Sequence, residues 1–506
     1  TVDAGVRTFM NAFNVLNGIP ATGNKYLQRE VLKGKWAFDG FVVTDWGSID
    51  EMTSHGLAKD GKEAAKIAAN AGSDMDMESH LYVKELAGLV REGKVKESFI
   101  DDAVKRILKV KFELGLFEDP YKYCDEVREK EVIGQQAFHE AALDLAKKSI
   151  VLLKNENQLL PLKKQGQKIA LIGALAADKN SPLGNWRIAA KDHSAVSVLE
   201  GMQAYKENKL TYAKGADVSV GYTAFTAQVQ INTTDKSEFP QAIEAAKSAD
   251  VVVMVLGEIG YQSGEGRSRT KLGLPGVQQE LLEAVYEVNK NIVLVLNNGR
   301  PLVLNWHHEN LPAIVEAWQL GTQSGNAIAQ VLYGDYNPSG KLPMSFPRAV
   351  GQVPIYYNYK NTGRPTGAPG VFWSHYEDEE NSPLYPFGYG LSYTSFEYSN
   401  LKTSVVSEKE VQVSVTLKNS GKQTGKEVVQ LYIRDHFASV TRPVRELKGF
   451  ELVSLEPNES QEVLFTLTEK ELGFYDNDGN FILEPGDFSI FVGGDSNANL
   501  QAIISL

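Results

Sequence analysis

Two short runs of uninterrupted apolar residues, Val251–Leu256 and Ile292–Leu296, constrain the fold of this chain more than any other feature. A strand with one solvent-exposed face alternates apolar and polar residues, whereas a strand buried on both faces is apolar throughout. Both runs follow helical patterns, at Phe239–Ser248 and Val277–Asn289. We therefore expect a mostly parallel sheet covered by helices on both faces, an α/β sandwich domain over residues 131–347. Further elements are predicted as a helix at His139–Lys154 and strands at Lys168–Ile172 and Ala313–Ala317.

Residues 1–120 repeat the alternation of strands and helices in shorter pieces. Strands are predicted at Thr8–Phe13, Gly40–Thr44 and Ser73–Met77, and helices at Tyr26–Lys35, Ala64–Ala71, Leu81–Glu92 and Ile100–Leu114. Units of this kind build parallel sheets, whose ligands bind at the carboxyl ends of the strands.

Residues 395–506 have a different pattern, with apolar residues at every second position and turn residues between the runs. Four such runs, Val411–Leu417, Val428–Ile433, Val463–Leu467 and Phe488–Val492, predict a fibronectin III-like β-sandwich. The stretch 348–394 before it is rich in Pro, Gly and aromatic rings, and we interpret it as a connector.

Composition excludes several classes of protein. The net charge of −12 argues against nucleic acid as a partner, and no apolar stretch approaches the roughly 20 residues of a membrane span. The single cysteine, Cys124, excludes an internal disulfide and any cysteine-built metal site. The acids at Asp74, Asp76 and Glu78 are spaced by two as in a calcium loop, but the glycine and the distant bidentate Glu of such a loop are absent. His307 and His308 are expected to face solvent. We expect no cofactor and no metal.

Asp45 is the strongest local candidate for chemistry. It directly follows the predicted strand Gly40–Thr44, where parallel folds place reacting groups, and Trp46 beside it offers an aromatic face that suits a sugar ring. On position alone, an aspartate that caps a turn or a helix is the favoured explanation, and the neighbouring Trp46 shifts the balance toward a functional role.

The residues around Asp45 also resemble a known family. The stretch Val31–Ser48, VLKGKWAFDGFVVTDWGS, is similar to the active-site signature of glycoside hydrolase family 3. The likeness extends to further landmarks at Asn14–Thr22, Leu114–Phe117, Ser149–Asn155, Tyr333–Pro343 and Leu384–Tyr393. The resemblance implies that Asp45 is a catalytic nucleophile and that residues 1–120 are the C-terminal portion of a (β/α)8 barrel, which needs about 250 residues and eight strands.

A retaining glycosidase needs a second carboxyl group as its acid/base. In the resembling family this group comes from a loop after a central strand of the second domain, which leaves Glu258 and Glu265 as candidates. We favour Glu265, since it lies between glycines in a loop and its spacing resembles that of the family's acid/base. The alternatives are Glu258, or a solvated Glu265 that pairs with Arg267 or Arg269.

These inferences predict a retaining β-glycosidase, with a β-glucosidase acting on short β-glucosides as the leading interpretation. A β-xylosidase, a β-N-acetylhexosaminidase and a non-catalytic carbohydrate-binding surface protein are the alternatives. Sugar contacts are expected from Trp46, Met10, Phe13, Glu258 and Arg267. The chain begins at Thr1, so we expect a truncated protein that is inactive alone, with a periplasmic or secreted parent and compatible with a homodimer.

Overall fold

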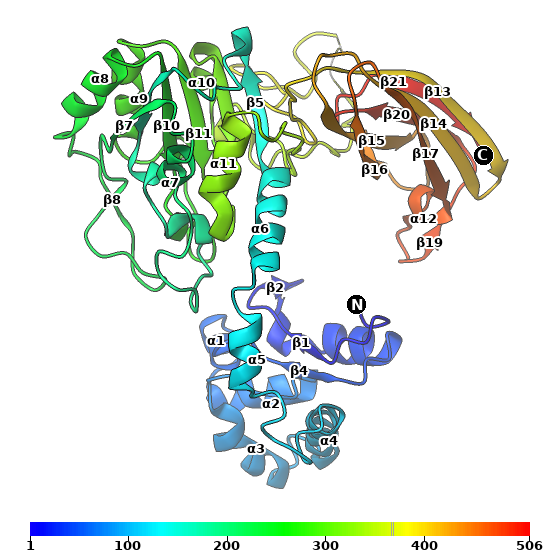
Figure 1. The fold of residues 1–506 in the computed structure, drawn as a ribbon. Helices are drawn as coiled ribbons and strands as arrows, with labels where there is room; N and C mark the ends of the chain where they lie inside the picture. The colour runs from blue at the N-terminus through cyan, green and yellow to red at the C-terminus, as the bar shows by residue number, and fades with distance from the viewer. Residues whose placement is uncertain (366, 368) are drawn as a thin grey trace. The chain divides into compact units, whose positions relative to one another are not determined.

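A computed structural model describes residues 1–365, 367 and 369–506 (Figure 1). The described chain divides into two compact units, Thr1–Ile133 and Gly134–Leu506. Each unit is described separately. Within the described residues, no helix is long and apolar enough to cross a membrane.

The first unit is built on a small parallel sheet. Strand β1 (Thr8–Met10) pairs in parallel with β4 (Phe41–Val43), and Met75 adds a single parallel bridge to Val43. The helices around it are Tyr26–Lys35, which has π-type hydrogen bonding, α1 (Ser48–Ser54), α2 (Gly61–Ala71), α3 (Leu81–Arg91), α4 (Glu97–Glu113) and α5 (Glu126–Val132). The short strands β2 (Val15–Leu16) and β3 (Ile19–Pro20) form a hairpin.

Of the strand predicted at Ser73–Met77, only Met75 forms a β-bridge, the one with Val43. The backbone N–H groups of Asp74 and Met75 both donate to the same carbonyl, Val42 O, at 2.8 and 3.1 Å. Two successive donors on one acceptor cannot continue a regular ladder, in which each carbonyl takes one N–H. The side chain of Asp74 is free to turn inward instead, with consequences described below.

The second unit begins with a sheet of strand order β5-β12-β11-β10-β6-β7. Its strands are β5 (Val151–Asn155), β6 (Lys168–Ile172), β7 (Lys209–Ala213), β10 (Val251–Gly257), β11 (Ile292–Asn297) and β12 (Ala313–Glu316). All neighbours pair in parallel except β5, which is antiparallel to β12 at one edge. The hairpin of β8 (Ser219–Val220) and β9 (Gln230–Ile231) follows β7.

Side chains alternate strictly between the two faces of this sheet. Val251, Val253 and Val255 pack on the face covered by α6 (Gln136–Ser149), α7 (Val198–Gln203) and α11 (Ser324–Leu332). The intervening Val252, Met254 and Leu256 pack on the face covered by α8 (Phe239–Lys247), α9 (Gln278–Tyr286) and α10 (Asn305–Asn310). The expected sheet with helices on both faces is present, and neither face of β10 is exposed to solvent.

The predicted helix His139–Lys154 is wrong over its last five residues, 150–154. Helix α6 ends at Ser149, and Val151–Asn155 forms the edge strand β5. The apolar run from Ile150 to Leu153 continues the helical pattern without a break in polarity, but its β-branched start and full burial suit a strand. Sequence analysis also missed β7, α7, α10 and α11.

The C-terminal part of this unit is a β-sandwich. One sheet has the order β13-β14-β17 and the other β16-β15-β20-β21. The strands are β13 (Phe396–Ser407), β14 (Glu410–Asn419), β15 (Gly425–Asp435), β16 (Glu446–Leu455), β17 (Ser460–Thr468), β20 (Asp487–Gly493) and β21 (Leu500–Ser505). Helix α12 (Glu469–Leu472) and the hairpin of β18 (Phe474–Tyr475) and β19 (Phe481–Ile482) follow β17.

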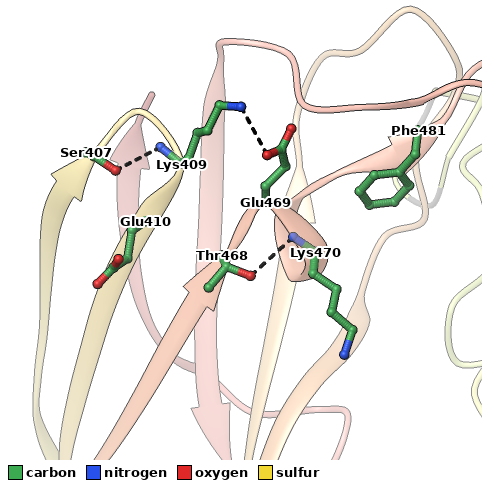
Figure 2. Close-up of a pocket in the computed structure, with 7 residues that line it drawn as sticks. All are labelled: Ser407, Lys409, Glu410, Thr468, Glu469, Lys470 and Phe481. Carbon is green, nitrogen blue, oxygen red and sulfur yellow. Dashed lines mark hydrogen bonds and ion pairs between the residues drawn. The ribbon is translucent and has the colours of Figure 1, made fainter. Parts of the chain in front are cut away.

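Two hollows lie in this part of the unit. A shallow one of about 530 Å³, at one end of the sandwich, contains the exposed ion pair of Lys409 and Glu469 (Figure 2). A larger one of about 1330 Å³ lies between the connector, with Trp373 and Tyr376, and the sandwich, with Arg445.

The domain boundaries given in the sequence analysis stay predictions.

His307 in α10 is buried, contrary to the expectation that it faces solvent. The side chain is only 3% exposed, and neither ring nitrogen has a hydrogen-bond partner among the described residues. Burial therefore lowers its pKa from the ordinary 6.5 to about 4. His308 next to it is half-buried, and its Nδ1 lies 2.9 Å from the hydroxyl oxygen of Tyr385, within hydrogen-bond distance.

We predict that His307 makes the second unit acid-sensitive. Between pH 6.5 and about 4 the unfolded chain binds a proton that the folded unit does not, so stability falls as pH falls through this window. The loss reaches roughly 3 kcal/mol, at about 1.4 kcal/mol for each pKa unit. His307→Phe should remove most of this dependence in urea denaturation at pH 7.5 and 4.5, whereas the control His193→Gln, at an exposed position of the same unit, should not. An unchanged acid dependence in His307→Phe would contradict the assignment.

Candidate active site

The first candidate carboxylate, Asp45, lies two residues beyond the end of β4. Its Oδ1 accepts a hydrogen bond from the backbone N–H of Trp46 at 2.7 Å, which fixes the rotation of the carboxylate. The Trp46 side chain is 63% exposed, so the ring is open to a ligand. Among the described residues, Asp45 has no ion-pair partner.

The turn that carries Asp45 is held by backbone geometry. Gly47 has φ +68°, a left-handed conformation that favours glycine, and it is the N-cap of α1. Its N–H donates to Met77 O at 2.9 Å, and the hydroxyl of the buried Thr44 accepts from Met77 N–H at 2.9 Å. The turn after β4 is thereby tied to the segment that follows Met75.

A buried polar network lies beside this turn, and sequence analysis missed it. The Thr22 hydroxyl is 2.9 Å from Ser48 Oγ and 3.0 Å from Asn11 Oδ1. Ser73 Oγ joins the network, since it is 3.0 Å from both Asn11 Nδ2 and Gln28 Oε1. Because buried polar groups must find partners, this network specifies how the loops pack behind the turn. The only sequence signal for it was the landmark Asn14–Thr22, which ends on Thr22.

A buried ion pair supports β4 from its other side. Lys33 Nζ lies 2.7 Å from both carboxylate oxygens of Asp74, and the two side chains are 6% and 3% exposed. Asp74 Oδ2 also accepts from Val42 N–H at 2.8 Å, within β4 itself. Burial lowers the pKa of Lys33, and the charge of Asp74 opposes this shift. Asp74 therefore serves the strand and not a ligand.

The other predicted contacts in this unit are placed as follows. Met10 is 58% exposed and pairs in register with Val43 on the neighbouring strand, two residues before Asp45. Phe13 is half-buried in the loop after β1. Asp76 accepts from the Ser79 hydroxyl and from Tyr82 N–H, so it shapes the turn before α3. The described residues contain no group of three acids, histidines or cysteines that could hold a metal ion.

The second candidate carboxylate, Glu265, lies in the loop after β10. Arg267 N–H donates to Gly264 O at 3.2 Å and closes a tight turn, in which Gly266 has φ +67°. Gly264 has φ +106°, and a Cβ there would lie 2.1 Å from the buried Asn185 Nδ2. Glycine is required at both positions, which leaves Glu265 exposed at the tip of the turn.

Glu265 is not paired with either of the arginines that follow it. Arg267 Nη2 donates to the carbonyls of Phe225 and Ala227 at 2.6 and 3.0 Å, and Arg269 forms an ion pair with Glu258. Among the described residues, Glu265 has no ion-pair or hydrogen-bond partner for its carboxylate. The solvated but paired glutamate considered in the sequence analysis is therefore not what the structure shows.

Glu258 differs from Glu265 in every respect. It has no exposed surface, and its carboxylate is bound by Arg269 and by Arg300, whose Nε is 3.1 Å from Oε1. A carboxylate so engaged does not reach a sugar, so we correct its assignment as a sugar contact. Arg267 uses Nη2 to hold backbone carbonyls, and its contact with a sugar stays a prediction. Arg300 was missed, although Asn298-Gly-Arg300 directly follows the buried strand β11.

Comparison with known proteins agrees with this architecture. Residues 1–110 match the glycosyl hydrolase family 3 N terminal domain, residues 150–393 the family 3 C-terminal domain, and residues 427–496 a fibronectin type III-like domain. The periplasmic beta-glucosidase of Salmonella typhimurium is 42% identical over 98% of this chain and 67% of its own length. A beta-xylosidase of Formosa agariphila is 38% identical over 100% of this chain and 69% of its own.

Solved structures give the same result. The crystal structure of a beta-glucosidase from Listeria innocua in complex with glucose superposes with a TM-score of 0.91 at 38% identity. The match covers 100% of this chain and 68% of that one. The chain belongs to glycosyl hydrolase family 3 and is a glycoside hydrolase. The fold class expected from sequence, α/β domains followed by a fibronectin III-like β-sandwich, is confirmed.

We predict that the pair of Lys33 and Asp74 stabilises the first unit strongly. Lys33→Met leaves a buried carboxylate without a cation and should cost about 3 kcal/mol in the free energy of unfolding. Lys62→Met, which removes the exposed pair with Glu92, should cost much less, because water and salt screen exposed charges. Urea denaturation measures both.

The double variant Lys33→Met/Asp74→Asn provides the second readout. It should be less destabilised than the sum of the two single variants, because the second change removes the uncompensated charge. Equal losses in Lys33→Met and Lys62→Met would contradict the role of the buried pair.

Proposed function

We propose that this protein is a retaining β-glucosidase that removes terminal β-D-glucose from short β-glucosides, with Asp45 as nucleophile and Glu265 as acid/base. One observation carries the proposal. The carboxylates of Asp74 and Glu258 are buried and bound by cations, whereas those of Asp45 and Glu265 lack an ion-pair partner among the described residues. A carboxylate that must bond to a sugar or exchange a proton with it has to be available in this way.

The chemistry is a double displacement. An oxygen of Asp45 attacks the anomeric carbon while the bond to the departing oxygen breaks, and Glu265 gives that oxygen its proton. The product of this step is a glycosyl ester on Asp45. Glu265, now ionised, takes a proton from water, whose oxygen attacks the same carbon and releases the sugar with retained configuration. The exposed ring of Trp46 is suited to stack on the pyranose during both steps.

The substrate class follows from the relatives. The Salmonella relative is named a beta-glucosidase, and the Listeria enzyme has been solved with glucose and with laminaribiose. The relative from Formosa favours a second candidate function, β-xylosidase, at 38% identity. We further propose a periplasmic location, because the Salmonella relative is named a periplasmic beta-glucosidase.

Asp45→Asn in the full-length protein should lower kcat/KM for 4-nitrophenyl β-D-glucoside by at least about a thousand-fold, since the amide cannot form the glycosyl ester. The matched control is Asp50→Asn, an exposed acid in the first turn of α1, which should keep nearly the wild-type value. Both variants are compared with wild type by initial rates and by circular dichroism. Near-normal turnover in Asp45→Asn would exclude it as nucleophile.

Glycine variants with azide distinguish the two roles. Glu265→Gly should be rescued by sodium azide and yield β-glucosyl azide, because the small anion enters the space of the acid/base and attacks the glycosyl ester. Asp45→Gly should instead yield α-glucosyl azide, since azide then takes the place of the nucleophile. The anomer is assigned by NMR. If Glu265→Gly forms no β-azide, then the acid/base lies elsewhere.

A further inference from the structure

We propose that Glu258, Arg269 and Arg300 form a positioning clamp that fixes the loop of Glu265 for acid catalysis. The inference rests on the proposed role of Glu265 and deepens it. The three residues are called the Glu258 clamp below. None of them needs to touch the substrate.

The centre of the clamp is a carboxylate with no exposed surface. Glu258 directly follows β10, and its backbone N–H donates to Asn297 O at 2.7 Å, so its position is set by the sheet. Arg300 Nε lies 3.1 and 3.2 Å from the two carboxylate oxygens. Arg269 Nη1 binds Oε1, so two guanidinium groups compensate one buried charge. The arrangement leaves Glu258 little freedom to move.

Each arginine uses a second nitrogen to hold the loop. Arg300 Nη2 donates to Gln262 O and, at 2.9 Å, to Arg267 O. These two carbonyls stand on either side of the turn that carries Glu265. Arg269 Nη2 donates to Gly273 O at 2.9 Å, where the chain returns toward α9. The loop is therefore tied on both sides of Glu265 to one buried carboxylate.

The clamp also controls charge near the proposed acid/base. An arginine that paired with Glu265 would stabilise its ionised form and make it a poorer acid. Arg269 and Arg300 are instead engaged by Glu258, and Arg267 is engaged by backbone carbonyls. Removal of the Glu258 charge frees the cations of Arg269, in the same loop as Glu265, and of Arg300, which contacts the carbonyls on either side of Glu265. The clamp should thus act on acid catalysis and not on general binding of the sugar.

Leaving-group dependence tests this directly. The value of kcat/KM reports glycosylation, in which a poor leaving group such as phenol requires a proton and 2,4-dinitrophenol does not. Glu258→Gln should lower kcat/KM at least about tenfold for phenyl β-D-glucoside and less than about threefold for the 2,4-dinitrophenyl glucoside. Arg300→Lys keeps a cation beside Glu258 and so should fold, but it cannot span both carbonyls, and it should show the same selective loss.

Two further variants complete the test. Glu316→Gln changes another buried carboxyl group, at the same carboxyl end of the parallel strands, which binds Asn298 and Trp318 N–H, and should affect both substrates equally. In Glu258→Gln/Glu265→Gln, the phenyl glucoside should lose no more than in Glu265→Gln alone, since the clamp acts through Glu265.

The outcomes separate the inference from the proposed function. Equal losses on both substrates in Glu258→Gln and Arg300→Lys, or additive losses in the double variant, would overturn the clamp and leave Glu265 as acid/base. If Glu265→Gln itself shows no leaving-group dependence, the proposed function of Glu265 fails first. Selective loss in all of these variants except Glu316→Gln supports both.

Discussion

The arrangement of the second unit depends on one constraint, which is that the carboxylate of Glu258 is buried and must be compensated. A charge without exposed surface is costly unless cations and hydrogen bonds replace the lost water. Arg269 and Arg300 supply both: Arg269 reaches Glu258 because the loop after β10 folds back over it, and Arg300 reaches it from the segment after β11. The fully buried strand β10 thus determines where the loop starts, and Glu258 determines how the loop is tied.

The first unit also contains a buried carboxylate that is compensated by a cation, and this pair lies beside strand β4. Asp74 turns inward, binds Lys33 and accepts from the backbone of Val42, and the end of β4 is supported by that pair. In both units a cation-bound carboxylate supports a strand or its loop, and a second carboxylate nearby is left without a cation.

Most of the architecture could be predicted from the sequence. The runs at Val251–Leu256 and Ile292–Leu296 predicted the covered sheet correctly, because an uninterrupted apolar strand has no other stable environment. The end of α6 was misplaced, since burial on all sides erases the difference between helical and strand periodicity. Asp45 and Glu265 were found from local motifs and stay proposals.

The burial of Glu258 was missed for a different reason. Whether a glutamate after a strand is exposed depends on partners distant in sequence, and Arg300 is 42 residues from Glu258. No local pattern carries that information. The network of Thr22, Ser48 and Ser73 was missed for the same reason, because its members come from three segments that are far apart in the sequence.

The central claim, that Asp45 is the nucleophile of a retaining enzyme, is tested most directly by trapping the glycosyl ester. A 2-deoxy-2-fluoro-β-D-glucoside with a dinitrophenyl leaving group forms the ester quickly and hydrolyses it slowly, so the label can be located by peptide mass spectrometry. The account predicts one added fluoroglucosyl group on the peptide that contains Asp45, and loss of labelling in Asp45→Asn. A label on another carboxylate, or inactivation without any covalent label, would contradict it.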